Sequence, residues 1–134
     1  MAVLSSETFE LRDSDHIVLV RQATRRFAVQ LGFGIVDQTK IVTASSELAR
    51  NTVEYGGGGT AVIETVESAG KKGVRVIFED QGPGIPDVEQ ALTDGYTSGH
   101  GMGLGLGGAK RLCHEFEITT TLGLGTRIAI VRWK

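Results

Sequence analysis

Apolar and polar residues recur along the chain with two spacings, one typical of strands and one typical of helices. A loose alternation over residues 3–12 predicts a first strand. Helical spacing of apolar residues then predicts a helix to about Leu31, which either Ser14 or Asp15 can cap. The same spacing predicts a second helix over about 36–55, ended by the glycines that follow. Its buried stripe is expected to consist of Ile41, Ala44, Leu48, Thr52 and Tyr55.

Two β-rich segments, at about 60–67 and 73–80, follow the second helix and are expected to form an antiparallel hairpin. Successive side chains of a strand point to opposite faces. The predicted arrangement therefore places the carboxylate of Asp80 on the apolar side of the sheet, at the end of the second strand. The residues that share this face are Val74, Val76, Phe78 and Asp80.

A glycine-rich segment over 94–108 leads into a third helix that is expected to end near Glu115, and further strands are expected at about 116–121 and 126–133. These elements predict an α/β (α+β) two-layer sandwich, with about three helices packed on a mixed, mainly antiparallel sheet. The pattern contains no internal repeat and no interdomain linker, so residues 1–134 are expected to form a single domain.

The composition narrows the classes of protein to which the chain can belong. The formal net charge is -2 and the basic residues are scattered, which argues against a nucleic-acid partner. Cys113 is the single cysteine, so one copy of the chain can build neither a disulfide framework nor a cysteine zinc site, as is typical of a reducing compartment. No apolar stretch approaches the roughly 18 residues that span a bilayer. We therefore expect a cytoplasmic protein without a membrane partner.

Four polar residues, Glu47, Arg50, Asn51 and Glu54, are spaced so that they share one face of the second predicted helix. Such a stripe is often no more than a solvated helix face. Asn51 favours a functional interpretation, because asparagine is a poor helix former and its side-chain oxygen suits a hard cation such as Mg²⁺.

A DxGxG motif, formed by Asp80, Gly82 and Gly84, follows directly after an apolar strand. Its glycines allow the backbone to approach a flat ligand closely, and its carboxylate can accept a hydrogen bond from an amino group. The alternative is a plain turn with a capping aspartate. The inward direction of Asp80 favours binding, because a buried carboxylate requires a partner.

Glycine occupies every second position from 99 to 105, within the segment TSGHGMGLGL. Unobstructed backbone N–H groups followed by a helix N-terminus form a cradle suited to phosphates. A flexible linker is the alternative. The segment is not a Walker loop, because no GK[ST] follows it.

These motifs occur in a fixed order: ExxxN, DxGxG about thirty residues later, GxGxGL, and then GT at the last predicted strand. In this order they resemble the GHKL superfamily, which includes histidine-kinase catalytic domains, gyrase-type ATPases and bacterial anti-sigma kinases. ELARN would be the N box, DQGPGIP the first glycine box, SGHGMGLGL the second, and GLGT the last nucleotide contact. The resemblance is strongest to RsbT-like switch kinases of the stressosome, in ELARN, DQGPGIPD, DGYTSG, GLGLGGAKRL and EFEI, and covers essentially the whole chain. It implies a Bergerat ATP-binding fold.

The resemblance also implies roles for individual residues in binding ATP. Asn51 would ligate Mg²⁺, and Asp80 would accept a hydrogen bond from the adenine amino group. Gly82 and Gly84 of the first glycine box and Thr126 would complete the adenine pocket. The phosphates would be held by the backbone amides of Gly101, Met102, Gly103 and Leu104.

For catalysis, the resemblance implies that Glu47, one helical turn before Asn51, is the general base that takes the proton from an acceptor hydroxyl. One departure from the family concerns the lid. Anti-sigma kinases of the SpoIIAB type carry an arginine before the glycines, whereas this chain has His100 there. Arg50 is a candidate substitute for supporting the γ-phosphate.

The function that the resemblance implies is an ATP-dependent serine/threonine protein kinase of a partner-switching module. Its substrate would be a STAS-domain protein, and it would activate a downstream partner such as a PP2C-type phosphatase. The alternative is a nucleotide-dependent binding module that sequesters a sigma-factor-like regulator without obligatory catalysis. Homodimer formation is left open.

Overall fold

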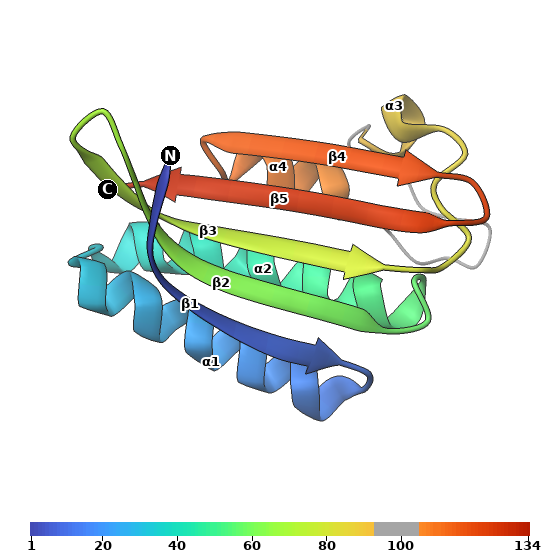
Figure 1. Cartoon of the computed structure of the whole chain (residues 1–134), viewed down its shortest axis with the longest axis horizontal. Helices are drawn as coiled ribbons and strands as arrows, with labels where there is room; N and C mark the ends of the chain where they lie inside the picture. Colours follow the sequence, from blue (N-terminus) through green and yellow to red (C-terminus); the bar gives the residue numbers. More distant parts are fainter. Residues whose placement is uncertain (93–104) are drawn as a thin grey trace.

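The computed structural model describes residues 1–92 and 105–134, and these residues form two layers, with helices on one face of a five-stranded sheet (Figure 1). The expected two-layer fold is confirmed. In chain order the elements are β1 (Ala2–Leu11), α1 (Ser14–Leu31), α2 (Ile35–Glu54), β2 (Gly59–Ser68), β3 (Lys71–Asp80), α3 (Val88–Ala91), α4 (Leu106–Arg111), β4 (Glu115–Thr121) and β5 (Gly125–Trp133).

The strands lie in the order β1-β2-β3-β5-β4, and every pairing between them is antiparallel. The sheet is therefore antiparallel throughout the described strands, where the sequence predicted a mixed, mainly antiparallel one. The reason lies in the helices between β1 and β2. The helices α1 and α2 run in opposite directions, so they return the chain to the end of the sheet where β1 stops, and Leu11 pairs with Gly59 (Figure 1). The remaining strands are joined by hairpins or, between β3 and β4, by the segment that contains α3 and α4.

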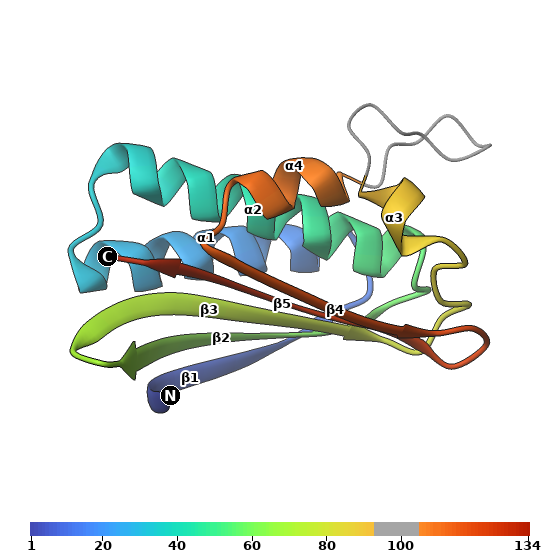
Figure 2. The same cartoon turned by 90° about the horizontal axis from the view of Figure 1, so that it is seen from above.

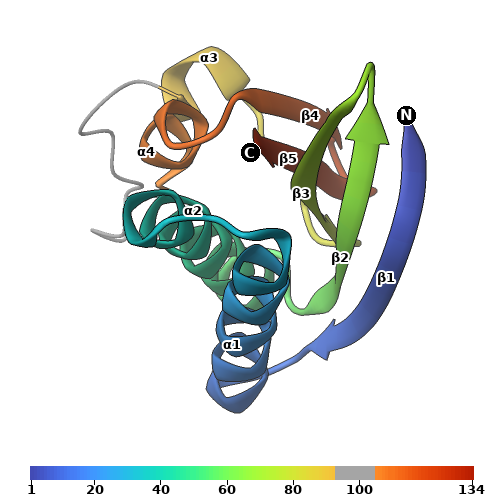
Figure 3. The same cartoon turned by 90° about the vertical axis from the view of Figure 1, so that its left-hand side faces the viewer.

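Both long helices pack against the same face of the sheet, as the view from above and the end-on view show (Figures 2 and 3). The predicted stripe on α2 is buried from Ile41 to Thr52, whereas Tyr55 is the half-buried residue that follows the helix. Helix α4 packs beside α2 (Figure 2). Within residues 1–92 and 105–134, no helix is long and apolar enough to cross a membrane.

The N-terminal cap of α1 differs from the expected one. The helix begins at Ser14, and Asp13 caps it by accepting a hydrogen bond from the backbone N–H of His16 at 3.1 Å. Ser14 and Asp15 are therefore the first two helical residues rather than caps. The difference arises because β1 ends at Leu11 and leaves two residues for the turn.

Helix α4 ends at Arg111, four residues before the expected end at Glu115. The side chain of Arg132 explains this early end, since its Nη1 donates to the carbonyl oxygen of Leu112 at 2.9 Å. The following backbone N–H, at His114, donates to Val131 in β5 at 2.9 Å, so the chain is already held against the sheet. The short helix α3, capped by Asp87, has no counterpart in the sequence-based expectation.

Candidate functional site

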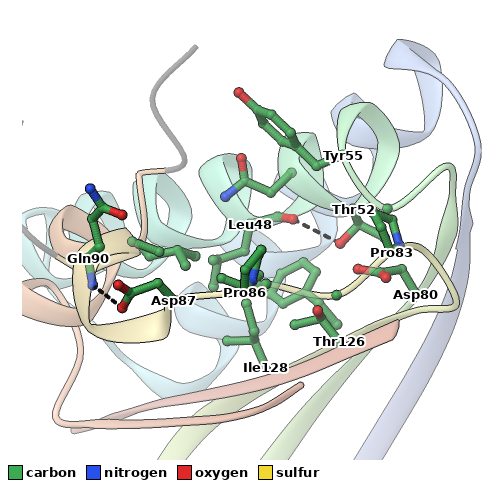
Figure 4. A pocket seen from close by; sticks show the side chains of 17 residues that line it. Leu48, Thr52, Tyr55, Asp80, Pro83, Pro86, Asp87, Gln90, Thr126 and Ile128 are labelled. Atoms are coloured by element: carbon green, nitrogen blue, oxygen red, sulfur yellow. Dashed lines mark hydrogen bonds between the residues drawn. The ribbon is translucent and has the colours of Figure 1, made fainter. Parts of the chain in front are cut away.

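A cavity of about 260 Å³ lies between the C-terminal half of α2 and one end of the sheet. Its walls come from Leu48 to Gly56 on one side and from β3 and β5 on the other. The loop 83–87, helix α3 and the first residue of α4 complete it (Figure 4). Eight of the seventeen lining residues are apolar, and the polar groups come from Asn51, Thr52, Tyr55, Asp80, Asp87, Gln90 and Thr126. A cavity of this kind suits a flat, largely apolar ligand with a few polar atoms.

Asp80 is the last residue of β3 and continues the buried face that Val74, Val76 and Phe78 begin. The predicted inward direction of Asp80 is therefore confirmed, and the residue lines the cavity. One carboxylate oxygen, Oδ1, accepts a hydrogen bond from the backbone N–H of Gly82 at 2.9 Å. This bond fixes the side chain and leaves the second oxygen available to accept from a ligand.

Two glycines of adjoining loops make room for this carboxylate. A Cβ added to Gly56 would lie 2.5 Å from Cβ and Cγ of Asp80 and 2.6 Å from Oδ2. A Cβ added to Gly82 would lie 2.7 Å from the carbonyl oxygen of Gly56. Side chains at either position would collide with fixed atoms, so the backbone after α2 and the backbone after β3 can touch only because both residues are glycine.

Gly84 joins the first glycine box to the hairpin between β4 and β5. Its φ is +80°, in the left-handed region that favours glycine, and a Cβ there would lie 2.7 Å from the carbonyl oxygen of Thr121. The backbone N–H of Gly123 donates to the carbonyl oxygen of Pro83 at 2.9 Å. The predicted pocket residue Gly84 therefore lies where the loop and the hairpin meet, and it lines the cavity.

Thr126 is buried and lines the cavity from β5. Asp80 of β3 is its direct partner in the antiparallel register, and Thr120 of β4 is its partner on the other side. The hydroxyl oxygens of Thr120 and Thr126 are 2.9 Å apart. The three residues form a polar row across neighbouring strands. Figure 4 shows the side chains of Asp80 and Thr126 near each other at the cavity.

The structure separates the polar stripe that the sequence predicts on α2. Asn51 is half-buried and lines the cavity. Glu47 is half-buried and lies outside the cavity wall, against the start of α4, where a Cβ on Gly105 would meet its Oε2 at 2.7 Å. Arg50 and Glu54 are exposed. Only Asn51 of this set is therefore brought together with Asp80, Gly84 and Thr126 around the cavity.

The predicted phosphate cradle, Gly101, Met102, Gly103 and Leu104, lies outside the described residues, as does His100. The elements on either side of it are described. Ala91 of α3 and Leu106 of α4 both line the cavity, so the segment between them begins and ends at its border.

Some residues of the site have no functional role in the sequence-based prediction. Gly56, which lines the cavity, is predicted only as a helix stop, and Thr120, which lies outside the cavity wall, only as part of a strand. Gln90 lines the cavity from α3, and Pro86, which belongs to the predicted DQGPGIP box, lines it from the loop. The parity of the strand could have indicated Thr120, since it shares a face with Phe116 and Ile118, which pack against the core.

Comparisons with known proteins agree with this geometry. Residues 36–134 match the family model described as histidine kinase-, DNA gyrase B- and HSP90-like ATPase. The chain is 50% identical over 117 residues to the serine/threonine-protein kinase RsbT of Bacillus subtilis, covering 87% of this chain and 88% of the relative. It is 31% identical over 123 residues to the anti-sigma F factor of Clostridium novyi, covering 88% and 86% respectively.

Solved structures share the fold at low sequence identity. The RsbU and RsbW domains of a Mycobacterium tuberculosis protein superpose with a TM-score of 0.64 at 22% identity, covering 97% of this chain and 33% of that one. The catalytic domain of the histidine kinase ThkA gives a TM-score of 0.55 at 19% identity, covering 94% and 95%. At these identities the likeness supports the fold alone.

The chain belongs to the family of histidine kinase-, DNA gyrase B- and HSP90-like ATPases. Within that family it is a serine/threonine protein kinase of the RsbT-like kind, as the sequence motifs predicted. The family is one of nucleotide-binding proteins.

Proposed function

We propose that this kinase works in a partner-switching module, in which it phosphorylates a STAS-domain protein and then activates a PP2C-type phosphatase. The observation that carries the proposal is the 50% identity to the serine/threonine-protein kinase RsbT over most of both chains. The resemblance in the N box and both glycine boxes supplies the partner classes. We also propose that residues 1–134 act as one ATP-binding domain.

In this proposal adenine occupies the cavity between α2 and the sheet. The free oxygen of Asp80 accepts from the adenine amino group, since its other oxygen already accepts from Gly82 at 2.9 Å. Gly84 lets the loop backbone lie close to the ring, whereas Gly82 lies outside the cavity wall and acts through its hydrogen bond to Asp80. The buried Thr126 presents its hydroxyl beside Asp80. The apolar walls, such as Leu48 and Ile128, match the faces of a purine. The phosphates are assigned to the amides from Gly101 to Leu104, through the resemblance alone.

Asn51 is the residue that we assign to Mg²⁺. The ion would neutralise charge on the phosphates during transfer. Mg²⁺ is usually held by one or two protein oxygens together with substrate phosphates and water. Asn51 supplies such an oxygen from the cavity wall, and among the described residues no group of three or more His, Cys, Asp or Glu side chains forms a separate metal site.

Glu47 is assigned as the general base. It lies one helical turn before Asn51, and its carboxylate abuts Gly105, the residue that precedes α4. This position is outside the adenine cavity but at its border, where a hydroxyl from a partner protein can approach. Glu47 would take the proton of the acceptor hydroxyl as its oxygen bonds to the γ-phosphorus of ATP and the bond from that phosphorus to the leaving ADP breaks. General-base catalysis of this kind contributes about 10²–10⁴-fold.

Radiolabel transfer from ATP to a candidate STAS protein tests the proposal. The wild-type chain is expected to label the STAS protein on serine or threonine. Glu47→Gln is expected to reduce labelling about 10²–10⁴-fold while ATP affinity is retained. Asp80→Asn is expected to weaken ATP binding itself. Glu54→Gln, an exposed glutamate on the same helix, is the matched control and is expected to label normally.

A lack of transfer by the wild-type chain to any STAS protein of its own organism would contradict the kinase proposal, as would unchanged transfer by Glu47→Gln. The second candidate function is sequestration of a sigma-factor-like regulator, which the 31% identity to an anti-sigma F factor favours. It predicts a stable complex with a sigma factor in the presence of ATP, which forms equally well with Glu47→Gln.

A further inference from the structure

Thr120 makes three polar contacts that join the two loops of the proposed adenine site. Its Oγ1 accepts a hydrogen bond from the backbone N–H of Ile85, in the loop after the first glycine box, at 2.9 Å. The same oxygen lies 2.9 Å from Oγ1 of Thr126 and 3.3 Å from the carbonyl oxygen of Gly125. Thr120 itself is not part of the cavity wall, so it acts on the site through its neighbours.

The single hydroxyl hydrogen of Thr120 has two acceptors within reach, and its choice determines what Thr126 presents to the cavity. If Thr120 donates to the carbonyl oxygen of Gly125, the hydroxyl of Thr126 can donate to Thr120, and only lone pairs of Thr126 then face the ligand. If Thr120 donates to Thr126, the hydrogen of Thr126 is left to donate into the cavity. The 2.9 Å between the two threonine oxygens fits both arrangements, so the group that faces Thr126 in the cavity decides between them.

Adenine requires the second arrangement wherever one of its ring nitrogens faces Thr126. Its ring nitrogens N1, N3 and N7 are acceptors, and the only hydrogen-bond donor on its six-membered ring is the amino group, which we assign to Asp80. Thr126 lies directly across the strand pairing from Asp80, so in the proposed site its hydroxyl would face the same ring. A hydroxyl that showed only lone pairs there would repel a ring nitrogen.

We propose that Thr120 is a positioning residue for base recognition: it donates to Thr126 and thereby turns the Thr126 hydroxyl toward a ring nitrogen of adenine. This inference rests on the proposed ATP site and goes beyond it, because it assigns adenine specificity to a residue outside the cavity wall. The hydrogen bond that Thr120 accepts from the backbone N–H of Ile85 holds the Thr120 oxygen in place. The position of the loop at Ile85 and the direction of the Thr126 hydroxyl therefore depend on the same side chain.

Ligand analogues separate this role from a structural one. The dissociation constants of ATP and of its 1-deaza, 3-deaza and 7-deaza analogues are measured by calorimetry with the full chain. Thr120→Val removes the hydroxyl and keeps the shape of the side chain. Thr120→Ser keeps the hydroxyl. Thr119→Val is the matched control, since Thr119 is exposed on the opposite face of the same strand.

Thr120→Val is expected to weaken ATP binding about threefold to tenfold, the range of one net hydrogen bond. Thr120→Val and the wild-type chain should bind one deaza analogue with equal dissociation constants, namely the analogue that lacks the nitrogen that Thr126 contacts. Thr120→Ser should restore the wild-type affinity for ATP, and Thr119→Val should leave it unchanged. If the valine variant does not fold, Thr120→Ala compared with Thr120→Ser isolates the same hydroxyl.

If Thr120→Val loses affinity for ATP and for every deaza analogue by the same factor within twofold, the inference is overturned. A structural defect would weaken the binding of all four ligands alike. Failure of the wild-type chain to bind ATP would overturn the proposed nucleotide site and this inference with it. Failure of phosphoryl transfer with normal ATP binding would count against the kinase proposal and leave the ligand comparison valid.

Discussion

Gly56→Ala is the substitution that tests most directly how the nucleotide site is built. The new methyl group would lie 2.5 Å from Cβ and Cγ of Asp80, whereas ordinary contacts are 3.4–4 Å. These atoms are near the backbone of Asp80, so a rotation of the carboxylate alone does not remove the clash. The loops after α2 and after β3 must separate, or Asp80 must turn out of the cavity.

Either response has a calculable effect. Overpacking of this kind costs about 1–3 kcal/mol of folding stability. If Asp80 turns away, the site loses a hydrogen bond that involves a charged group, worth roughly 1.5–3 kcal/mol. Because about 1.4 kcal/mol corresponds to tenfold, ATP affinity should fall about tenfold to hundredfold.

Calorimetric titration with ATP and a thermal melt measure the two effects separately. Gly57→Ala is the neighbouring control, since a Cβ there meets nothing within 4 Å, although its φ of +75° strains the backbone. Gly34→Ala has neither contact nor strain and should change little. ATP affinity of Gly56→Ala within twofold of wild type, with Asp80 still required for binding, would refute the packing argument.

Two further predictions follow from the shifted pKa values. Burial raises the pKa of the Cys113 thiol to about 12 from an ordinary 9.0, so at pH 8 its thiolate fraction is about a thousandfold lower than normal. Labelling by a thiol reagent should be correspondingly slow and should accelerate on unfolding in denaturant; rapid labelling of the folded chain would contradict this. The Arg132 guanidinium donates a hydrogen bond to Asp37 at 2.6 Å and lowers the pKa of that carboxyl below its ordinary 3.8. The pair therefore stabilises the folded state above pH 3.8. This stabilisation is lost as the pH falls through the pKa of Asp37 in the folded state. Asp37→Asn should therefore lower Tm at pH 7, with a deficit that shrinks in acid; a deficit independent of pH would refute the electrostatic cause.

Local patterns predicted most of the fold because its long elements carry clear periodicity. The alternation in 73–80 placed Asp80 on the buried face, and the helical spacing gave the stripe on α2. The end of α4 could not be predicted, since it depends on Arg132, a residue twenty positions away from Leu112 in the sequence. The sequence predicted a mainly antiparallel sheet, but that β2 also runs antiparallel to β1 depends on the packing of α1 against α2, which local patterns do not encode.

The candidate site was predictable where a motif marks it, with strand parity in addition for Asp80 and through the GT motif and the family resemblance alone for Thr126. Gly56 and Thr120 were missed because their importance comes from contacts between strands and loops. Gly56 matters through its approach to Asp80, and Thr120 through the register that pairs it with Thr126. No spacing along the chain encodes that register.

Strand β5 follows β4 in the sequence but lies between β3 and β4 in the sheet. During synthesis on a ribosome, therefore, Asp80 and Asn51 are made well before the strand that carries Thr126 can join them. Until residues 125–133 emerge, β3 has an unpaired edge and the cavity lacks one wall. A ligand that contacts this wall can therefore stabilise the chain only after β5 has joined the sheet.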